Sequence, residues 1–133
     1  MDVGEARTAL VGVWRSLSYG DRSAVEDSWE LTFGDEPRGL IVYHRSGLMS
    51  VQVAAAPSDD VAPWRYIGYL GTFDVQEADR DEEKIVGIVL HHMDVAYPPE
   101  LLDEEPEREF HLQGDSLMLG DGLIARRILE RIG

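Results

Sequence analysis

The sequence predicts a single all-β domain, an antiparallel β-barrel of eight or nine short strands arranged as a meander after a short N-terminal helix. Three observations predict this fold. Short runs of β-branched, aromatic and aliphatic residues recur along the chain, separated by Gly, Asp, Ser and Pro. Helical periodicity is scarce after residue 10. The length of 133 residues suits one domain, Met1–Gly133, that can bury a core without disulfides.

The elements follow one another closely. Asp2–Leu10, which contains Glu5, Ala6 and Arg7, is expected to form the helix. Nine strands are expected after it, at Val11–Tyr19, Ser28–Phe33, Gly39–His44, Leu48–Ala54, Tyr66–Gln76, Glu83–Met93, Arg108–Gln113, Ser116–Leu119 and Leu123–Arg131. Short strands with tight connections favour a closed or nearly closed meander.

Turn residues define the hairpins. Arg45-Ser46-Gly47 joins two strands, and Gly47 is suited to a positive φ. Gln113-Gly114-Asp115 joins two more in the same manner, and Gly120-Asp121-Gly122 is a third turn. Turn chemistry therefore supports antiparallel neighbours along this part of the chain.

Two longer connections are predicted. Ala55–Pro63 is expected to be a loop that could act as a flap. Pro98–Pro106 is a second loop, with one helical turn expected at Glu100–Glu104.

Side-chain alternation assigns the faces of the strands. The inward set is Ile41, Tyr43, Met49, Val51, Val53, Ile67, Tyr69, Gly71, Phe73, Val75, Arg108, Phe110 and Leu112. His44, Leu48, Ser50 and Gln52 fall on the outer face. The inward faces are apolar and aromatic, as the interior of a barrel requires.

Ile85–Leu90 is an exception, because it is apolar on both faces. Such a strand is covered on both sides. Either the N-terminal helix or a second subunit could cover the outer side. We favour a subunit, so a homo-oligomer is expected through this strand.

Charge and composition restrict the partners. The formal net charge is −14, from 26 acidic and 12 basic residues, so the chain should repel phosphate backbones and bind no nucleic acid. No Cys is present, which excludes disulfides and cysteine nucleophiles. The start, Met1–Glu5, lacks the features of a signal peptide, and no apolar run is long enough to span a membrane. A cytoplasmic location without membrane contact is expected.

Neither a metal nor a cofactor is expected. His91 and His92 are neighbours in a strand and point to opposite faces, and His44 and His111 have no ligand spacing with them. The sequence contains no Gly-x-Ser-x-Gly motif and no phosphate-binding glycine loop.

Four segments carry a resemblance: Leu10–Tyr19 with its Gly-x-Trp, Pro37–Gln52, Tyr66–Phe73 followed by Leu90–His92, and the tail Leu129–Ile132. They resemble the bacterial and fungal lipocalin-like domain family of calycin-type barrels, although Leu129 stands where that family usually has Trp. The resemblance implies a lipocalin-like barrel with Trp14 at its closed end near Arg131. It also implies binding of hydrophobic molecules, and similar small barrels of secondary metabolism include cofactor-free cyclases and isomerases.

Aromatic residues on the inward faces are candidates for a pocket wall. They are Tyr43, Tyr69, Phe73 and Phe110, with Met49 as an adaptable filler. They could instead simply fill a core. Inward polar groups favour the pocket, because a dry core rarely tolerates His91, Arg108 and Arg127 unpaired. Trp64, Tyr66 and Trp29 lie near strand ends and suit a rim.

Two functions follow from such a pocket. One is a cofactor-free cyclase or isomerase, for example a cycloaddition catalyst, acting on a polyketide- or polyene-like intermediate, with Tyr43, Tyr69 and His91 as catalytic residues. These would donate a hydrogen bond to a carbonyl, or His91 would move a proton. Met49, Trp64, Tyr66, Phe73, Arg108 and Phe110 would bind the substrate. The other is a carrier that sequesters an apolar metabolite. A protein-interaction module acting through Ile85–Leu90 ranks below both.

Overall fold

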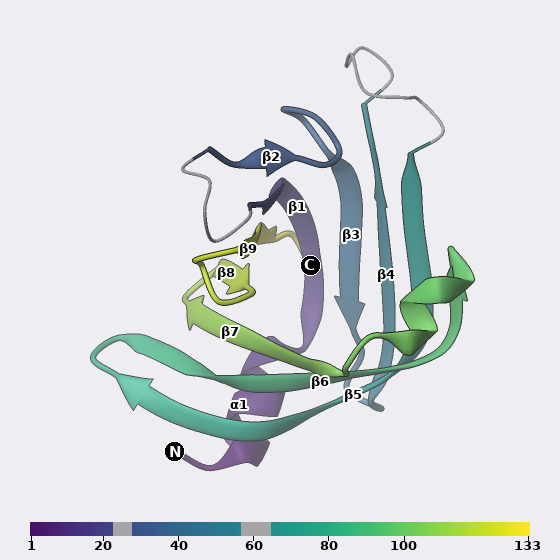
Figure 1. Ribbon diagram of the computed structural model, residues 1–133. Coiled ribbons are helices and arrows are strands. Elements are labelled where there is room, and N and C mark those ends of the chain that lie inside the picture. Colours follow the sequence, from purple (N-terminus) through teal and green to yellow (C-terminus); the bar gives the residue numbers. More distant parts are fainter. Residues whose placement is uncertain (23–27, 57–64) are drawn as a thin grey trace.

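The computed structural model describes residues 1–22, 28–56 and 65–133 and confirms an all-β antiparallel barrel with a short N-terminal helix (Figure 1). The described elements are α1 (Val3–Leu10), β1 (Gly12–Asp21), β2 (Glu30–Leu31), β3 (Arg38–Tyr43), β4 (Leu48–Ala54), β5 (Tyr66–Asp81), β6 (Lys84–Tyr97), the 3₁₀ turn η1 (Pro99–Asp103), β7 (Glu107–Gln113), β8 (Ser116–Leu119) and β9 (Ala125–Arg131).

The barrel closes because the last strand pairs with the first. From β3 to β9 each described strand is hydrogen-bonded to the next in the sequence, and β9 returns to β1 from Trp14↔Arg131 to Asp21↔Ala125. Strand β3 pairs with the beginning of β1, and β2 pairs only with its end, at Gly20↔Leu31. In the described residues, β2 is therefore an extra strand on a ring of eight.

Helix α1 packs against one end of the barrel. Asp2 caps it by accepting a 2.7 Å hydrogen bond from the Gly4 N–H, and Ala6 and Leu10 are fully buried. Trp14 donates from Nε1 to the Leu10 carbonyl at 2.9 Å, and the Arg131 guanidinium lies 4.3 Å from the centre of a Trp14 ring. The expected proximity of Trp14 and Arg131 is confirmed.

The predicted faces are also confirmed. The inward residues Ile41, Tyr43, Met49, Val51, Val53, Phe73, Val75, Phe110 and Leu112 are buried. On the opposite face, His44, Leu48 and Gln52 are exposed and Ser50 is partly buried. Alternation in β3 and β4 was a sufficient guide because their pairing runs without a bulge.

The hairpin of β5 and β6 is longer than predicted. Strand β5 continues from Gln76 to Asp81, and β6 continues from Met93 to Tyr97. The added residues of β5, Glu77–Asp81, are mostly charged and show no apolar alternation. They form a strand because each pairs with a residue of β6. The turn contains Glu82 at φ 56°, a left-handed conformation that the sequence did not signal, since no Gly is present.

Two other predicted strands are too long. Ser28–Phe33 reduces to Glu30–Leu31, because the chain turns after Leu31, whose carbonyl accepts from the Gly34 N–H. The last strand begins at Ala125 rather than Leu123. Before it, Asp121 Oδ1 accepts hydrogen bonds from the N–H groups of residues 123, 124 and 125, which holds a turn.

Strand Ile85–Leu90 is largely covered within one chain. Val89 is fully buried, and the other five residues are partly buried. The second subunit expected over this strand stays a prediction. No helix among the described residues is long and apolar enough to cross a membrane.

Candidate functional site

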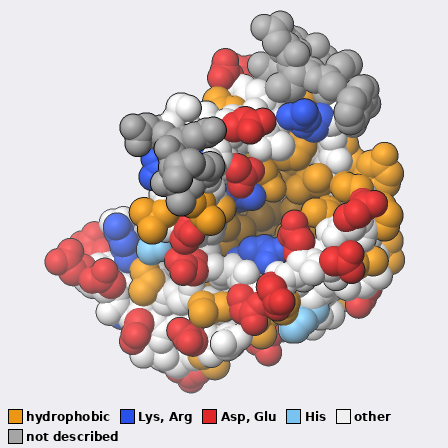
Figure 2. Space-filling model, in the orientation of Figure 1, with side chains coloured by type: hydrophobic (Ala, Val, Ile, Leu, Met, Phe, Trp, Pro, Cys, Tyr) orange, Lys and Arg blue, Asp and Glu red, His pale blue; other side chains and the backbone are white. Residues whose placement is uncertain are grey.

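The interior of the barrel contains a cavity of about 220 Å³ at the end opposite α1. Figure 2 shows a hollow with a hydrophobic wall and basic side chains at its edge. Its apolar lining includes Ile41, Val51, Val53, Ile67, Leu119 and Leu129. A cavity of about 150 Å³ is large enough to bind benzene, so this space accommodates a compact organic molecule.

Three side chains form a hydrogen-bonded chain at the cavity floor. Tyr43 Oη lies 2.5 Å from His91 Nε2, and Tyr69 Oη lies 2.8 Å from His91 Nδ1. Strands β3, β5 and β6 each contribute one residue. Tyr43 and His91 are buried, with only 1% and 2% of their surface exposed. Tyr69 and His91 line the cavity, and Tyr43 lies behind His91.

Gly71 allows β6 to approach β5 next to this chain of residues. A Cβ at Gly71 would lie 1.8 Å from the His92 carbonyl oxygen, so any side chain would push the two backbones apart. The pairing register shifts here, between Leu70 and Gly71. The close approach sets the position of His91 relative to Tyr69.

All three groups are uncharged at neutral pH. Burial, assisted by the positive charge of Arg108 and by His92, lowers the pKa of His91 from 6.5 to about 3. Burial also raises the pKa of Tyr43 well above 10, and it raises the pKa of Tyr69 in the same direction. The floor is therefore a neutral Tyr–His–Tyr chain.

The hydrogen bonds determine which way the protons point. A neutral imidazole has one N–H donor and one acceptor nitrogen. Within the described residues His91 is the only hydrogen-bond partner of the Tyr43 hydroxyl, so its proton goes to Nε2. His91 then donates from Nδ1 to Tyr69, because the other tautomer would leave a buried hydroxyl proton unpaired, at a cost of about 1–3 kcal/mol. Tyr69 consequently keeps its own O–H for a ligand.

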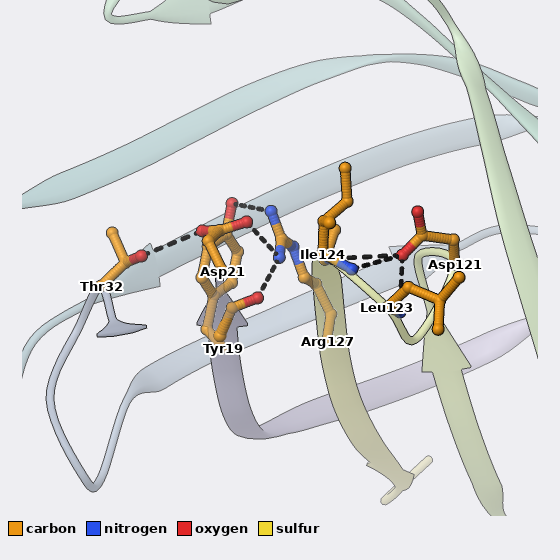
Figure 3. A network of polar contacts seen from close by, with 9 residues as sticks. Tyr19, Asp21, Thr32, Asp121, Leu123, Ile124 and Arg127 are labelled. Atoms are coloured by element: carbon orange, nitrogen blue, oxygen red, sulfur yellow. Dashed lines mark hydrogen bonds and ion pairs between the residues drawn. The ribbon is translucent and has the colours of Figure 1, made fainter. Parts of the chain in front are cut away.

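Two arginines add positive charge to the lining. Arg127 donates to the Gly20 carbonyl at 2.7 Å, to Asp21 at 2.9 Å and to Tyr19 Oη at 3.0 Å (Figure 3). Arg108 donates to the carbonyls of Glu105 and Glu107 and, at 3.2 Å, to the carboxylate of Glu104. Tyr19 and Glu104 line the same cavity.

The structure brings together only part of the predicted site. Tyr69, His91 and Arg108 line the cavity, and Tyr43 contacts His91 beneath it. Met49, Phe73 and Phe110 are buried in the packed half of the core and do not line the cavity.

The predicted rim residues lie elsewhere. Tyr66 lies on the outer surface, with its ring 6.2 Å from that of Tyr97. Trp29 packs beside the guanidinium groups of Arg22 and Arg126. Trp64 lies outside the described residues.

Tyr19 is the main lining residue that the sequence did not reveal. Strict alternation from Trp14 places Ser16 and Ser18 inward, but the pairing of β1 with β9 shifts between Ser16 and Ser18. This bulge turns Tyr19 toward the cavity instead. Nothing in the sequence of β1 marks the bulge. Leu101 and Glu104 also line the cavity, and both come from the loop that follows β6.

Among the described residues, no group of three or more His, Asp or Glu side chains could hold a metal ion. Comparison with protein-family models, with curated proteins and with solved structures finds no match to this chain. The resemblance to the lipocalin-like family therefore stays a prediction, and the geometry of the barrel carries the functional argument.

Proposed function

We propose that the barrel binds a small, mainly apolar molecule in its cavity and catalyses a cofactor-free cyclisation or isomerisation of it. The observation that carries this proposal is the neutral Tyr43–His91–Tyr69 chain at the floor of a cavity whose wall is mainly aliphatic. Buried polar groups cost stability unless they are paired, and a protein that needed only a core could fill this region with aliphatic side chains.

Tyr69 is the catalytic residue in this proposal. Its O–H points away from the occupied His91 nitrogen and can donate to a substrate carbonyl. As negative charge develops on that oxygen, a fixed donor in a water-poor site stabilises it more strongly than water does. The raised pKa of Tyr69 favours hydrogen bonding over complete transfer of the proton.

His91 is assigned a positioning role. A histidine with the ordinary pKa of about 6.5 would be suited to proton transfer near neutral pH. The pKa of about 3 makes His91 a weak base, so it orients Tyr69 instead, and Tyr43 in turn fixes the tautomer of His91.

The cavity volume limits what can react there. At about 220 Å³ it lies below the roughly 300–1,000 Å³ of most ligand pockets. A polyketide- or polyene-like substrate would place a compact, folded reacting part inside and leave the remainder in the mouth. Confinement of this kind can lower a barrier by about 7–11 kcal/mol in favourable cases.

A carrier is the second candidate, and one observation favours it. Tyr43 and both ring nitrogens of His91 are already paired within the floor, and His91 is too weak a base to abstract a proton at neutral pH. A carrier needs only the shape of the cavity and its few donors.

The experiment compares Tyr69→Phe with Tyr66→Phe, a matched substitution on the outer surface of the same strand. Linear polyenes with a terminal carbonyl are incubated with each protein, and the products are followed by mass spectrometry and NMR. Catalysis predicts turnover by wild type and Tyr66→Phe and a loss of about 10²–10³-fold in Tyr69→Phe, as when one transition-state donor is removed. Binding without turnover by any of the three proteins would favour the carrier.

A further inference from the structure

We infer that the bound molecule carries a delocalised oxyanion with two oxygens, either a carboxylate or the enolate of a 1,3-dicarbonyl compound. The inference rests on the proposed function only in requiring that the cavity binds a ligand. It comes from the polar side chains of the lining, nearly all of which offer donors rather than acceptors.

Two tyrosine hydroxyls present protons to the cavity. Tyr69 Oη accepts from His91 Nδ1, and Tyr19 Oη accepts from Arg127 at 3.0 Å. Each oxygen is thus held by a neighbouring N–H, and each hydroxyl keeps its proton free to donate. The two phenols are near enough for Tyr19 to contribute to the raised pKa of Tyr69. A ligand reaching both must supply acceptor oxygens.

The charge of the lining is opposite to that of the chain. The protein has a formal net charge of −14, yet Arg108 and Arg127 both line the cavity. The charge of Arg108 acts on the floor: it partly opposes the rise in pKa that burial gives Tyr43 and Tyr69, and it adds to the fall in pKa that burial gives His91. An anion in this space is stabilised by nearby guanidinium groups where the dielectric constant is low.

Arg108 also has donors to spare. A guanidinium carries five N–H donors. Arg108 uses two at the carbonyls of Glu105 and Glu107 and one at Glu104, which leaves two without a described partner. These could form charge-assisted bonds to a second ligand oxygen.

Glu104 is the one acidic side chain in the described lining, and it opposes an anionic ligand. Its side chain is 53% exposed, against 22% for Arg108. It can therefore turn outward into water and release Arg108 to the ligand. This competition makes Glu104 an informative position for substitution.

The test measures binding of two pairs of ring-sized probes by calorimetry. Benzoate is paired with benzamide, and the enolate of cyclohexane-1,3-dione is paired with cyclohexanone. At least one anion should bind about tenfold or more tightly than its neutral partner, because hydrogen bonds to charged groups are the stronger ones. Preference for benzoate alone identifies a carboxylate, and preference for the dione alone identifies an enolate.

Three variants locate the effect. Arg108→Gln should remove most of the preference for the anion, and Glu104→Gln should increase it by a few-fold, since Arg108 then lacks its internal partner. Arg15→Gln is the control, because Arg15 is exposed and pairs with Glu130 away from the cavity. It should leave binding unchanged.

The outcomes separate this inference from the proposed function. Equal binding of the neutral and anionic probes would overturn the inference and leave a ligand-binding barrel intact. A preference that survives in Arg108→Gln and is unaffected in Glu104→Gln would also overturn it. Absence of binding by all four probes, with the fold intact by circular dichroism, would count against both.

Discussion

The two halves of the barrel interior are built from the same strands but differ in how they are filled. The half next to α1 is packed with large side chains, among them Trp14, Tyr43 and Phe110, that are at most 1% exposed. The other half contains the cavity, with smaller aliphatic residues and the arginines around it. His91 and its two tyrosines lie at the boundary. The packed half supplies stability, which allows the hollow half to hold polar groups and empty space.

The largest effect should come from the packed half. Trp14→Ala removes a fully buried indole, its hydrogen bond to Leu10 and its contact with Arg131. We expect the free energy of unfolding to fall by about 3–5 kcal/mol. Urea denaturation followed by circular dichroism measures it. A loss below about 1 kcal/mol would contradict the division of the interior into two halves.

A larger side chain should lower stability in the packed half but should block ligand binding in the half that contains the cavity. Val89→Phe adds volume where the side chain is 0% exposed, so it should destabilise the fold by about 1–3 kcal/mol. Val53→Phe adds the same volume at the cavity wall, where there is space to receive it. This variant should keep its stability and lose ligand binding.

Urea denaturation measures the free energy of unfolding of Val89→Phe and Val53→Phe, and calorimetry measures their binding of a ring-sized probe. Equal destabilisation by the two substitutions would mean that the cavity does not accommodate a larger side chain. Retained binding in Val53→Phe would place the ligand elsewhere.

The two tyrosines at the boundary should also differ. Tyr43→Phe leaves His91 Nε2 without a donor in the packed half, at an expected cost of about 1–3 kcal/mol. Tyr69→Phe leaves His91 Nδ1 facing the cavity, where water can replace the lost hydroxyl, so the cost should stay below about 1 kcal/mol. Thermal unfolding of the two variants compares these costs. The reverse order would overturn the proton assignment.

Local patterns predicted the fold well because the barrel is made of hairpins between consecutive strands. Alternation placed Tyr43 and Tyr69 inward, and turn glycines placed the hairpin at Gly47, whose φ is 97°. A hairpin depends on residues that are close in the sequence, so its register follows from a short stretch of chain.

The division of the interior could not be predicted in the same way. Phe73 and Tyr69 share a face of one strand, yet Phe73 packs in the core and Tyr69 lines the cavity. Their depth along the barrel depends on strand tilt and on the position of α1, which alternation does not encode. The bulge that turns Tyr19 inward is a second case, because it arises from pairing with a strand more than a hundred residues away.

Acid sensitivity should give the finest test of the boundary, because it reports on the charge state of a single buried side chain. The pKa of His91 is about 3 in the folded protein, below the 6.5 expected when the chain unfolds. Between these values the unfolded state binds the extra proton, so this contribution to stability is complete above about pH 6.5 and is lost as the pH falls toward 3.

The slope from one such group cannot exceed about 1.4 kcal/mol per pH unit. The many carboxylates also titrate at acid pH, so the wild-type curve alone is not informative. Its difference from the curve of His91→Gln isolates the histidine, and we expect the wild type to lose stability more steeply between pH 6 and 4 by roughly 1 kcal/mol per unit. Parallel curves would mean that His91 is solvated or charged, and the neutral chain beneath the cavity would then have to be abandoned.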